Sequence, residues 1–513
     1  MFRTIVSGGL HGMDCYIVRV EVDASQGLPV FEIVGYQSGG VREARERIRV
    51  ALKNSGYKLP PVRITVNLTP ANIRKEGTAF DLPIAIGILS ALELIPKLHS
   101  DNVLMLGELG LDGQIRAVRG VLPLVMEAKR NGYTVCVVPF DNYAEALCVD
   151  GIHVMGVRSL SEVVDFLKKS SVTQKECIYL QREEWKKGES TVAEIKEDAY
   201  DFSLLSGQEN VKRSAVIAAA GFHHLLLKGP PGCGKSLAAK CIPSILPPLS
   251  REESLEVSKL FSIAGLINPS EGLVLKRPFF NPHHTITKQA MAGGGSVPKP
   301  GIISLSHRGV LFLDELPHFN REVIEIMRQP LEDKEINIIR ASGNYRYPAS
   351  FLLVAAMNPC PCGFYPDRNR CSCTSWEMKK YLSGISGPIM DRIDLCINVS
   401  PVRYEDIAGD IVRRRADSKE MSVDVLRARI RQEERYRGTA IKYNGELDGS
   451  NIKKFIKIGN KVNGLLRELF ETNCLSVRSY TKVLKVARTI ADIEGHEVVL
   501  EEDVLEACSY QQV

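Results

Sequence analysis

The sequence predicts an α/β protein that consists of an α/β N-terminal domain, an α/β core with a parallel sheet, and an all-α C-terminal domain. Runs typical of strands and of helices alternate from residue 1 to about 168, and again from about 202 to 399. From about residue 403 onward only helical periods remain. Because strands that alternate with helices favour a parallel sheet covered on both faces, we expect that architecture for the second run.

The first domain is expected to span residues 1–170. There "YIVRVEVD" and "VRITVNL" alternate apolar and polar residues as half-buried strands do, and "REARERIRVALKN" repeats apolar residues at helical spacing. Residues 171–200 are polar, mixed in charge and without a sustained period, so this segment is the predicted linker. The core is then residues 201–400, and the helical C-terminal domain, the lid, is residues 401–513.

Length and composition set the class of protein. A chain of 513 residues is too long for one hydrophobic core, and 44% hydrophobic with 25% charged residues is typical of a globular protein. The N-terminus lacks the features of a secretory signal, and no run reaches the roughly 18 apolar residues of a membrane span. We therefore expect a cytoplasmic protein without a membrane partner, with cysteines that are mostly reduced.

The net charge of +5 is too small to imply a polyanionic partner, but its distribution is uneven. Residues 451–488 are strongly basic and predicted to be helical. Either a solvated helix face or a surface for nucleic acid or phosphate explains this bias. The basic residues of this region are Lys453, Lys454, Lys457, Lys461, Arg467, Arg478, Lys482, Lys485 and Arg488.

A phosphate-binding loop is predicted at residues 229–236, "GPPGCGKS", between an apolar strand and a helix. Glycines let backbone N–H groups surround phosphate oxygens, and the flanking strand and helix are the context that this motif requires. Lys235 would reach the β and γ phosphates, and the Ser236 hydroxyl would ligate Mg²⁺. The predicted nucleotide-binding residues of the loop are Gly229, Pro230, Pro231, Gly232, Cys233, Gly234, Lys235 and Ser236.

A second buried strand, residues 310–313, ends in Asp314 and Glu315. Asp314 is expected to hold Mg²⁺, and Glu315 to act as the general base that activates water. An acidic pair that caps a helix is the alternative, which the phosphate loop upstream makes less attractive. A third buried strand, "FLLVAAMN", ends in Asn358, whose amide is expected to orient the attacking water.

Arg392 lies in "SGPIMDRIDL", on a predicted turn between a helix and a strand. It could reach the γ-phosphate of a neighbouring subunit as an arginine finger, which contributes about 10³ to 10⁵ in rate. A local ion pair with Asp391 or Asp394 explains the same residue equally well.

Four cysteines lie close together in "NPCPCGFYPDRNRCSC" with the spacing C-x-C-x₈-C-x-C. Two such pairs can close a tetrahedral Zn²⁺ site. An iron–sulfur cluster and free thiols remain as alternatives. Zinc is favoured because the loop follows the strand that ends in Asn358 and has few apolar residues of its own. The candidate ligands are Cys360, Cys362, Cys371 and Cys373.

An ordered set of motifs resembles the magnesium-chelatase-like AAA+ ATPases of the ComM/YifB type. The motifs are "GPPGCGKS", "PFFNPHHTITKQAMAGGG", "PKPGIISLSHRGVLFLDEL", "AAMNPCPCG", "GPIMDRIDL" and "LSVRSYTKVLKVARTIADIEG". The segments "GLPVFEIVG", "VNLTPANIRKEGTAFDLPIAIGIL" and "LGELGLDGQIRAVRGVLP" resemble the Lon-like domain of the same family.

This resemblance implies an ATP- and Mg²⁺-dependent homo-hexamer that acts on single-stranded or branched DNA, with other recombination proteins as partners. ComM-type members are helicases that promote branch migration during natural transformation. Arg392 matches the family's arginine finger, and Arg478 in "LSVRSY" matches the sensor 2 arginine of the lid. A remodelling or metal-chelatase-like ATPase that is indifferent to DNA is the alternative function.

The resemblance also assigns two insertions in the core. One is a β-hairpin within "EDKEINIIRASGNYRYPASF", where Lys334, Arg340 and Arg346 are expected near a central channel. The other surrounds "RPFFNPHHT", whose His283 and His284 are expected to have a packing or switch role, since no third metal ligand is evident.

The Lon resemblance raises a second chemistry, because Lon-type peptidases use a serine–lysine dyad. Here Ala79 occupies the serine position and Leu122 the lysine position. The N-terminal domain is therefore expected to be a scaffold or binding module.

Overall fold

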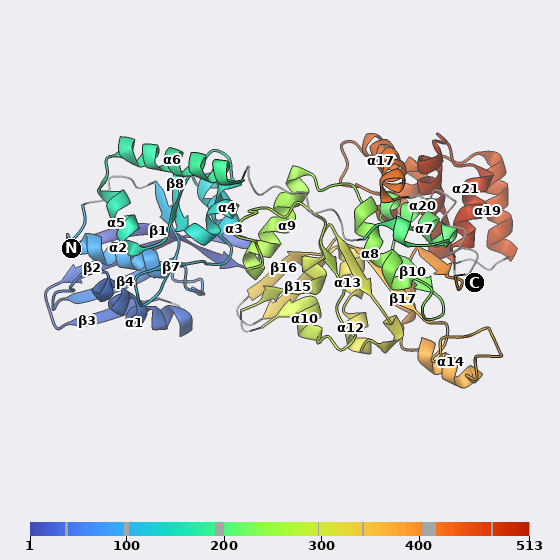
Figure 1. Ribbon diagram of the computed structural model, residues 1–513, viewed down its shortest axis with the longest axis horizontal. Helices are drawn as coiled ribbons and strands as arrows, with labels where there is room; N and C mark the ends of the chain where they lie inside the picture. The colour runs from blue at the N-terminus through green and yellow to red at the C-terminus, as the bar shows by residue number, and fades with distance from the viewer. Residues whose placement is uncertain are drawn as a thin grey trace.

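The computed structural model describes residues 1–35, 39–96, 102–189, 200–295, 297–340, 343–402, 417–472 and 476–511. The N-terminal domain, the core and the lid follow one another along the long axis of the molecule (Figure 1). The α/β class expected from the sequence is confirmed, with a helical C-terminal region.

A mixed seven-stranded sheet organises the N-terminal domain, in the order β3-β4-β2-β1-β5-β8-β9. β1 pairs antiparallel with β2, whereas β5, β8 and β9 run parallel. The strands are β1 Phe2–His11, β2 Asp14–Ser25, β3 Val30–Val34, β4 Arg63–Thr69, β5 Val103–Met105, β8 Val135–Pro139 and β9 His153–Val157, with a small pair of β6 Glu108–Leu109 and β7 Ile115–Arg116.

Helices cover both faces of this sheet, because successive strand residues point to opposite sides. Ile5 belongs to the hydrophobic cluster beneath one set of helices, and Val6 packs against the cluster on the other side. The helices are α1 Gly39–Asn54, α2 Asp81–Ala91, α3 Val121–Arg130, α4 Tyr143–Leu147 and α5 Leu160–Lys168.

The linker expected at residues 171–200 is wrong over its first part, which forms helix α6, Ser171–Glu189. α6 lies against the N-terminal domain (Figure 1). Ile178 is buried, the Gln181 side chain bonds Gly156, and Trp185 packs edge-on against Tyr143. Because most of α6 does not face the domain, most of its residues are polar. The sequence therefore shows no clear helical period of apolar residues. Residues 190–199 lie outside the described residues.

Five parallel strands form the sheet of the core, in the order β11-β14-β17-β10-β18. The apolar runs that predicted buried strands are fully buried here, as in β14 and β17. The strands are β10 Leu225–Lys228, β11 Phe279–Phe280, β14 Val310–Leu313, β17 Leu352–Met357 and β18 Leu395–Asn398.

The predicted hairpin is confirmed: β15 Glu335–Arg340 pairs antiparallel with β16 Gly343–Pro348. A shorter pair joins β12 Gly293–Gly294 to β13 Lys299–Pro300. The helices of the core are α7 Glu209–Gly221, α8 Lys235–Ile245, α9 Arg251–Ala264, α10 Lys288–Ala292, α11 Ile302–Leu305, α12 Arg321–Glu325, α13 Arg328–Asp333, α14 Ser375–Leu382 and α15 Gly387–Met390.

The lid is helical and shares one hydrophobic cluster with α7, α8 and the strands of the core. A buried polar network reinforces this contact, since the His223 ring bonds both Asp394 of the core and Thr489 of the lid. The lid helices are α17 Ser418–Arg435, α18 Gly449–Phe455, α19 Asn460–Thr472, α20 Val477–Glu494 and α21 Glu501–Ser509.

The N-terminal domain contacts the core at the hairpin and along α9, where Arg251 also pairs with Asp150. The His11 ring, at the end of β1, lies 4.4 Å from the Tyr345 ring of the hairpin. The Gly120 N–H donates to the Ser262 carbonyl, and the Ser262 hydroxyl donates to the buried Glu145 carboxylate at 2.6 Å. Among the described residues, no helix combines the length and the apolar character needed to cross a bilayer.

Candidate active site

The phosphate loop connects the carboxyl end of β10 to the first turn of α8. Gly232 and Gly234 have positive φ angles of 78° and 90°, which L residues rarely adopt. A Cβ on Gly229 would lie 2.5 Å from the Val399 carbonyl oxygen, so only glycine fits there. The loop therefore holds its backbone close to the start of α8, where free N–H groups and the helix dipole favour an anion.

Lys235 and Asn358 are brought together by adjacent strands. The Lys235 Nζ donates to the carbonyls of Gly229 and Pro230, each at 2.7 Å, and to Asn358 Oδ1 at 3.2 Å. β10 and β17 are parallel neighbours, so the residues that follow them meet at one edge of the sheet. The ammonium group is thus fixed where a phosphate on the loop would meet the Asn358 amide.

Ser236 and Asp314 form the second pair of the site. The Ser236 hydroxyl donates to Asp314 Oδ2 at 2.7 Å, and Asp314 Oδ1 accepts from the backbone N–H of Glu315 at 3.0 Å. A hydroxyl and a carboxylate in direct contact, beside a phosphate loop, are the donor set that Mg²⁺ takes together with phosphate oxygens. These residues therefore fit a Mg²⁺–nucleotide complex.

Two features bear on the position of the Glu315 side chain: its backbone conformation and a nearby histidine. Its φ of 54° lies in the left-handed region, which turns the chain sharply as it leaves β14. Its carboxylate is 54% exposed and lies 3.8 Å from Nδ1 of His284. The centre of the His284 ring lies 4.1 Å from that of His283, with the rings tilted by 34°, and 6.1 Å from that of His318. The pattern "HH" predicted packing or switching, and the structure adds contact with the expected general base.

Arg392 lies at the opposite edge of the same sheet. β18 pairs parallel with β10, with Leu395 beside Leu225, so residue 392 precedes the amino end of β18 while the phosphate loop follows the carboxyl end of β10. The strand length alone separates the two edges by about 10 Å. Arg392 therefore points away from the phosphate loop of its own chain.

Neither aspartate considered in the sequence pairs with Arg392. Its Nη1 donates to the Pro388 carbonyl at 2.6 Å, and its Nη2 donates to Glu332. The hydrogen bond from Arg392 lowers the pKa of the Glu332 carboxyl. Asp394 instead bonds His223 at 3.0 Å. The finger candidate is thus held in an ion pair within its own chain.

Arg478 lies at the same edge of the core sheet as Arg392. It lies in the first turn of α20, is 65% exposed, and donates from Nη1 to Asp391 Oδ2 at 3.0 Å. Because Asp391 precedes Arg392, both arginines belong to the edge away from Lys235. This placement could not be anticipated from the local motif, since it depends on how the lid packs on the core.

The four cysteines converge as their spacing predicted. The Cys360 sulfur lies 3.3 Å from that of Cys362 and 3.7 Å from that of Cys371, and all four sulfurs fall within 4.8 Å of one another. A tetrahedral site with Zn–S bonds of about 2.3 Å requires S–S separations near 3.8 Å. These residues therefore fit a Zn²⁺ ion.

The surroundings of the sulfurs favour thiolates at part of this cluster. The backbone N–H of Phe364 lowers the pKa of Cys362 to about 6, and the Tyr365 N–H donates to the Cys360 sulfur at 3.4 Å. The cysteines form a small cluster of their own with Phe364 and Met378, separate from the main cores. A metal would supply the cohesion that so few apolar residues cannot.

The other residues predicted from the sequence lie outside both the phosphate site and the cysteine cluster. Lys334 pairs with Glu446 of the lid at 2.6 Å, while Arg340 and Arg346 are exposed on the hairpin. Ala79 and Leu122, at the Lon dyad positions, pack in one hydrophobic cluster of the N-terminal domain.

The basic lid region divides into two groups. Lys482 donates to the Met390 and Ile393 carbonyls, Lys485 donates to Gly445, and Arg488 is buried with Asp492. These three side chains serve the fold. The exposed members are Lys453, Lys454, Lys457, Lys461, Arg467 and Arg478.

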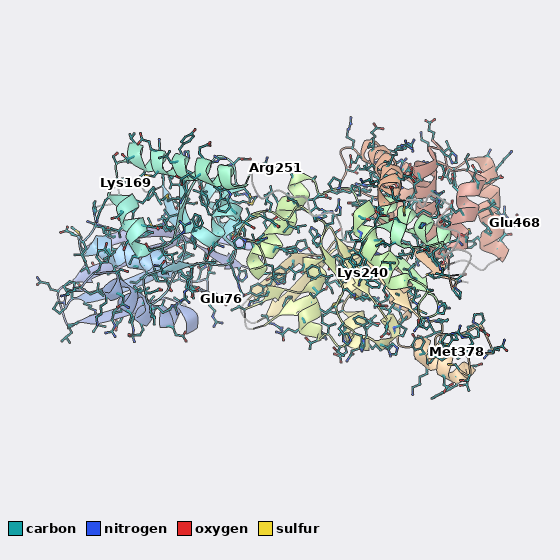
Figure 2. The ribbon with its side chains drawn as sticks, in the orientation of Figure 1. Glu76, Lys169, Lys240, Arg251, Met378 and Glu468 are labelled. Atoms are coloured by element: carbon teal, nitrogen blue, oxygen red, sulfur yellow. The ribbon has the colours of Figure 1, made fainter. Side chains whose placement is uncertain are left out.

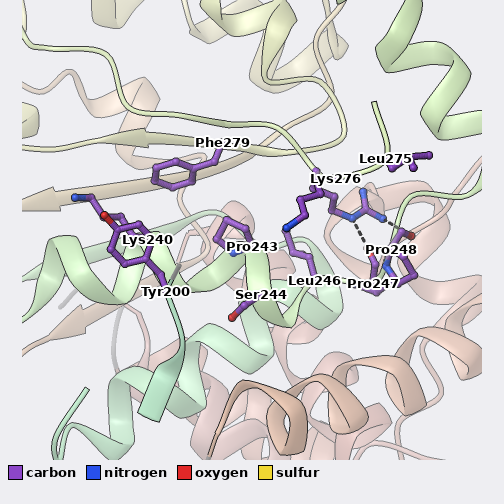
Figure 3. A pocket seen from close by; sticks show the side chains of 11 residues that line it. Tyr200, Lys240, Pro243, Ser244, Leu246, Pro247, Pro248, Leu275, Lys276 and Phe279 are labelled. Atoms are coloured by element: carbon purple, nitrogen blue, oxygen red, sulfur yellow. Dashed lines mark hydrogen bonds between the residues drawn. The ribbon is translucent and has the colours of Figure 1, made fainter. Parts of the chain in front are cut away.

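A cavity of about 570 Å³ lies at the far end of α8 (Figure 3). Tyr200, Lys240 and Phe279 line it, and Arg277 there is bonded to the Pro247 carbonyl at 2.5 Å. Lys235 begins α8, and the cavity is lined by residues from Lys240 to Leu246, which lie roughly 8 to 16 Å further along the helix axis. The cavity is not part of the candidate active site.

Comparison with known proteins decides the family. A model for the ChlI subunit of magnesium chelatase matches residues 201–407, a second ChlI model matches residues 20–142, and a ChlI C-terminal model matches residues 415–511. The chain is 39% identical over 503 residues to the competence protein ComM of Haemophilus influenzae, covering 98% of this chain and 95% of that protein. The chain belongs to the ComM/YifB family of magnesium-chelatase-like AAA+ ATPases.

Other members of the ComM/YifB family match over similar lengths. YifB of Escherichia coli is 38% identical over 502 residues, covering 98% of this chain and 95% of YifB. An uncharacterized protein of Mycobacterium tuberculosis is 38% identical over 509 residues, covering 99% of this chain and 98% of the relative. Lon protease 2 of Bacillus subtilis is 27% identical over 179 residues, 32% of each chain.

Proposed function

We propose that this protein is an ATP-driven hexameric DNA motor, a branch-migration helicase that aids integration of single-stranded DNA during natural transformation and recombination. The observation that carries the DNA role is the similarity to the competence protein ComM over 98% of the chain. The motor role is supported by the arrangement of two half-sites at opposite edges of the core sheet.

The carboxyl edge of the sheet is the half that binds ATP. The loop glycines and Lys235 would hold the phosphates, and Asn358 would position the attacking water. Glu315 would accept a proton from that water. Ser236 and Asp314 would hold Mg²⁺, which when bound neutralises phosphate charge and polarises the bond that breaks.

The opposite edge supplies the other half. Arg392 and Arg478 would leave Glu332 and Asp391 and meet the phosphates on the neighbouring subunit. A ring arises because each chain offers one half-site to each neighbour, which is a head-to-tail interface that closes on itself. Hydrolysis then alters the contact between subunits, and the exposed Arg340 and Arg346 of the hairpin are proposed to carry this movement to DNA.

The ChlI models favour a second candidate, a remodelling or metal-chelatase-like ATPase without DNA dependence. The two differ in how the ATPase responds to DNA. The DNA motor is tested directly by incubating the wild-type protein with ATP and a labelled three-stranded or four-way junction. The Glu315→Gln variant is the matched inactive control. Strand exchange by the wild type alone supports the motor. Failure of the wild type to process any junction, with ATPase activity unchanged by DNA, would favour the second candidate.

A further inference from the structure

The segment of residues 360–382, called here the cysteine module, projects from the core. It consists of the cysteine loop and α14, which extends from a corner of the molecule (Figure 1). None of the residues of α14 is buried. Met378 of α14, labelled in Figure 2, packs against the small hydrophobic cluster that the cysteines form.

The outer face of α14 carries an exposed tryptophan beside a lysine. Trp376 is 68% exposed, and the Nζ of Lys380, one turn later, lies 5.1 Å from the centre of its ring. Lys379 is also exposed. Met378 lies about 200° around the helix from Trp376, so packing on the sulfurs directs Trp376 outward.

The loop repeats this pairing of cations with aromatic rings. The Arg370 guanidinium lies 4.0 Å from the centre of the Phe364 ring, and that of Arg368 lies 5.2 Å from the Tyr365 ring. Tyr365 is 38% exposed. Aromatic faces and cations are therefore interleaved on the surface of the module.

The module's carboxylates are used within it. Glu377 accepts from the backbone N–H and the hydroxyl of Thr374, and Asp367 accepts from the N–H of Asn369. The exposed basic residues Arg368, Arg370, Lys379 and Lys380 outnumber the two carboxylates, so the module is net positive. Arg368 also donates from Nη1 to the Cys373 carbonyl at 3.4 Å.

We propose that the outer surface of the cysteine module binds a single strand of nucleic acid, with a base stacked on Trp376 and the basic residues beside the phosphates. Stacking on aromatic side chains within a basic surface is how proteins hold single strands without reading sequence. The net positive charge of this surface favours a polyanionic partner. This inference rests on the proposed function as a DNA motor. It identifies a surface of the motor that would contact a single DNA strand.

The position of the module connects this contact to the active site. On the inner side of α14, Tyr381 lies near Asn358: burial raises the pKa of the Tyr381 hydroxyl, and the backbone N–H of Asn358 opposes that rise. The Tyr381 ring lies 5.7 Å from that of His318, which neighbours His284. A strand that moves α14 would therefore act next to Asn358 and beside the histidines that neighbour Glu315.

The chain offers a direct reporter, because it has only two tryptophans. Trp185 packs against Phe140 and Tyr143 in the N-terminal domain, so Trp185→Phe leaves Trp376 as the sole tryptophan. Titrating this full-length variant with oligothymidylate should quench the tryptophan emission, and added salt should reverse the quenching. The matched control, Trp376→Phe, retains Trp185 and should show no quenching.

A second variant tests the phosphate contacts. Replacing Lys379 and Lys380 by glutamate should weaken oligothymidylate binding about tenfold or more, and should reduce the slope of log affinity against log salt by about 1.4. Reversing two exposed lysines of the N-terminal domain, Lys53 and Lys58, is the control for net charge and should change neither.

Three results would overturn the inference and differ in what they imply. If labelled oligothymidylate binds the Trp185→Phe variant without changing Trp376 emission, the strand lies elsewhere and the DNA motor is unaffected. If the emission follows protein concentration but not oligothymidylate, the module contacts a neighbouring subunit. If no oligothymidylate binds under any salt or nucleotide condition, the DNA role itself fails.

Discussion

The ammonium group of Lys235 is held by two loop carbonyls and by Asn358. These contacts occupy the charge that a phosphate would otherwise meet, so ATP binding must replace them. The same side chains were predictable from sequence, because each follows a short buried strand and the carboxyl ends of parallel strands meet at one edge. His284 was only partly predictable, since its contact with Glu315 joins residues from two separate loops.

Glu315 and His284 should contribute very unequally to the rate. Glu315→Gln removes the expected general base and should lower kcat at least about 100-fold while ATP still binds. A 3.8 Å pair with an exposed carboxylate contributes little, so His284→Ala should lower kcat less than about tenfold. Steady-state ATPase assays check both variants. Equal losses would assign His284 a direct part in catalysis.

Asn358 offers a matched pair of substitutions that separates binding from chemistry. Asn358→Ala removes the amide and should lower kcat with little change in KM. Asn358→Asp places a carboxylate 3.2 Å from the Lys235 ammonium and near the phosphates, and should also raise KM for ATP. A KM that is the same in both variants would mean that residue 358 does not face the phosphate.

At the scale of elements, the hydrophobic period and the turn residues of the sequence predicted the strands of the core and the hairpin. They did not predict helix α6. Among its described residues, the inward positions include Gln181 as well as Ile178 and Trp185, so the apolar period is interrupted. The cysteine spacing predicted convergence of the sulfurs, and the four do lie within 4.8 Å. The exposed face of α14 could not be predicted, because solvent exposure depends on where the module projects.

The cysteine module should depend on its metal. Purified protein is expected to contain one Zn²⁺ per chain, and Cys360→Ser or Cys371→Ser should abolish stoichiometric binding, since each removes one of four ligands. Cys177→Ser, outside the cluster, is the control and should retain the metal. Metal analysis of anaerobically purified protein checks this. Iron in place of zinc, or no metal at all, would contradict the prediction.

At the scale of the whole molecule, the central feature is that the two halves of the candidate active site lie at opposite edges of one sheet. Sequence predicted the residues of both halves but not the place of Arg478, which depends on the packing of α20 against the core. The lid and core share one hydrophobic cluster, and the hydrogen bond from Arg478 to Asp391 joins Arg478 to the edge that carries Arg392. In the proposed mechanism, a single chain therefore cannot complete its own site.

Mixing two inactive variants tests this division most directly. Lys235→Ala lacks the phosphate ligand but keeps Arg392, whereas Arg392→Ala keeps the phosphate loop but lacks the finger. Each alone should have almost no ATPase activity. In an equal mixture, up to about one quarter of the interfaces pair an intact loop with an intact finger, so activity should return toward that fraction of wild type. If Arg392→Ala alone is fully active, or if the mixed rings stay inactive, hydrolysis between neighbouring subunits is contradicted.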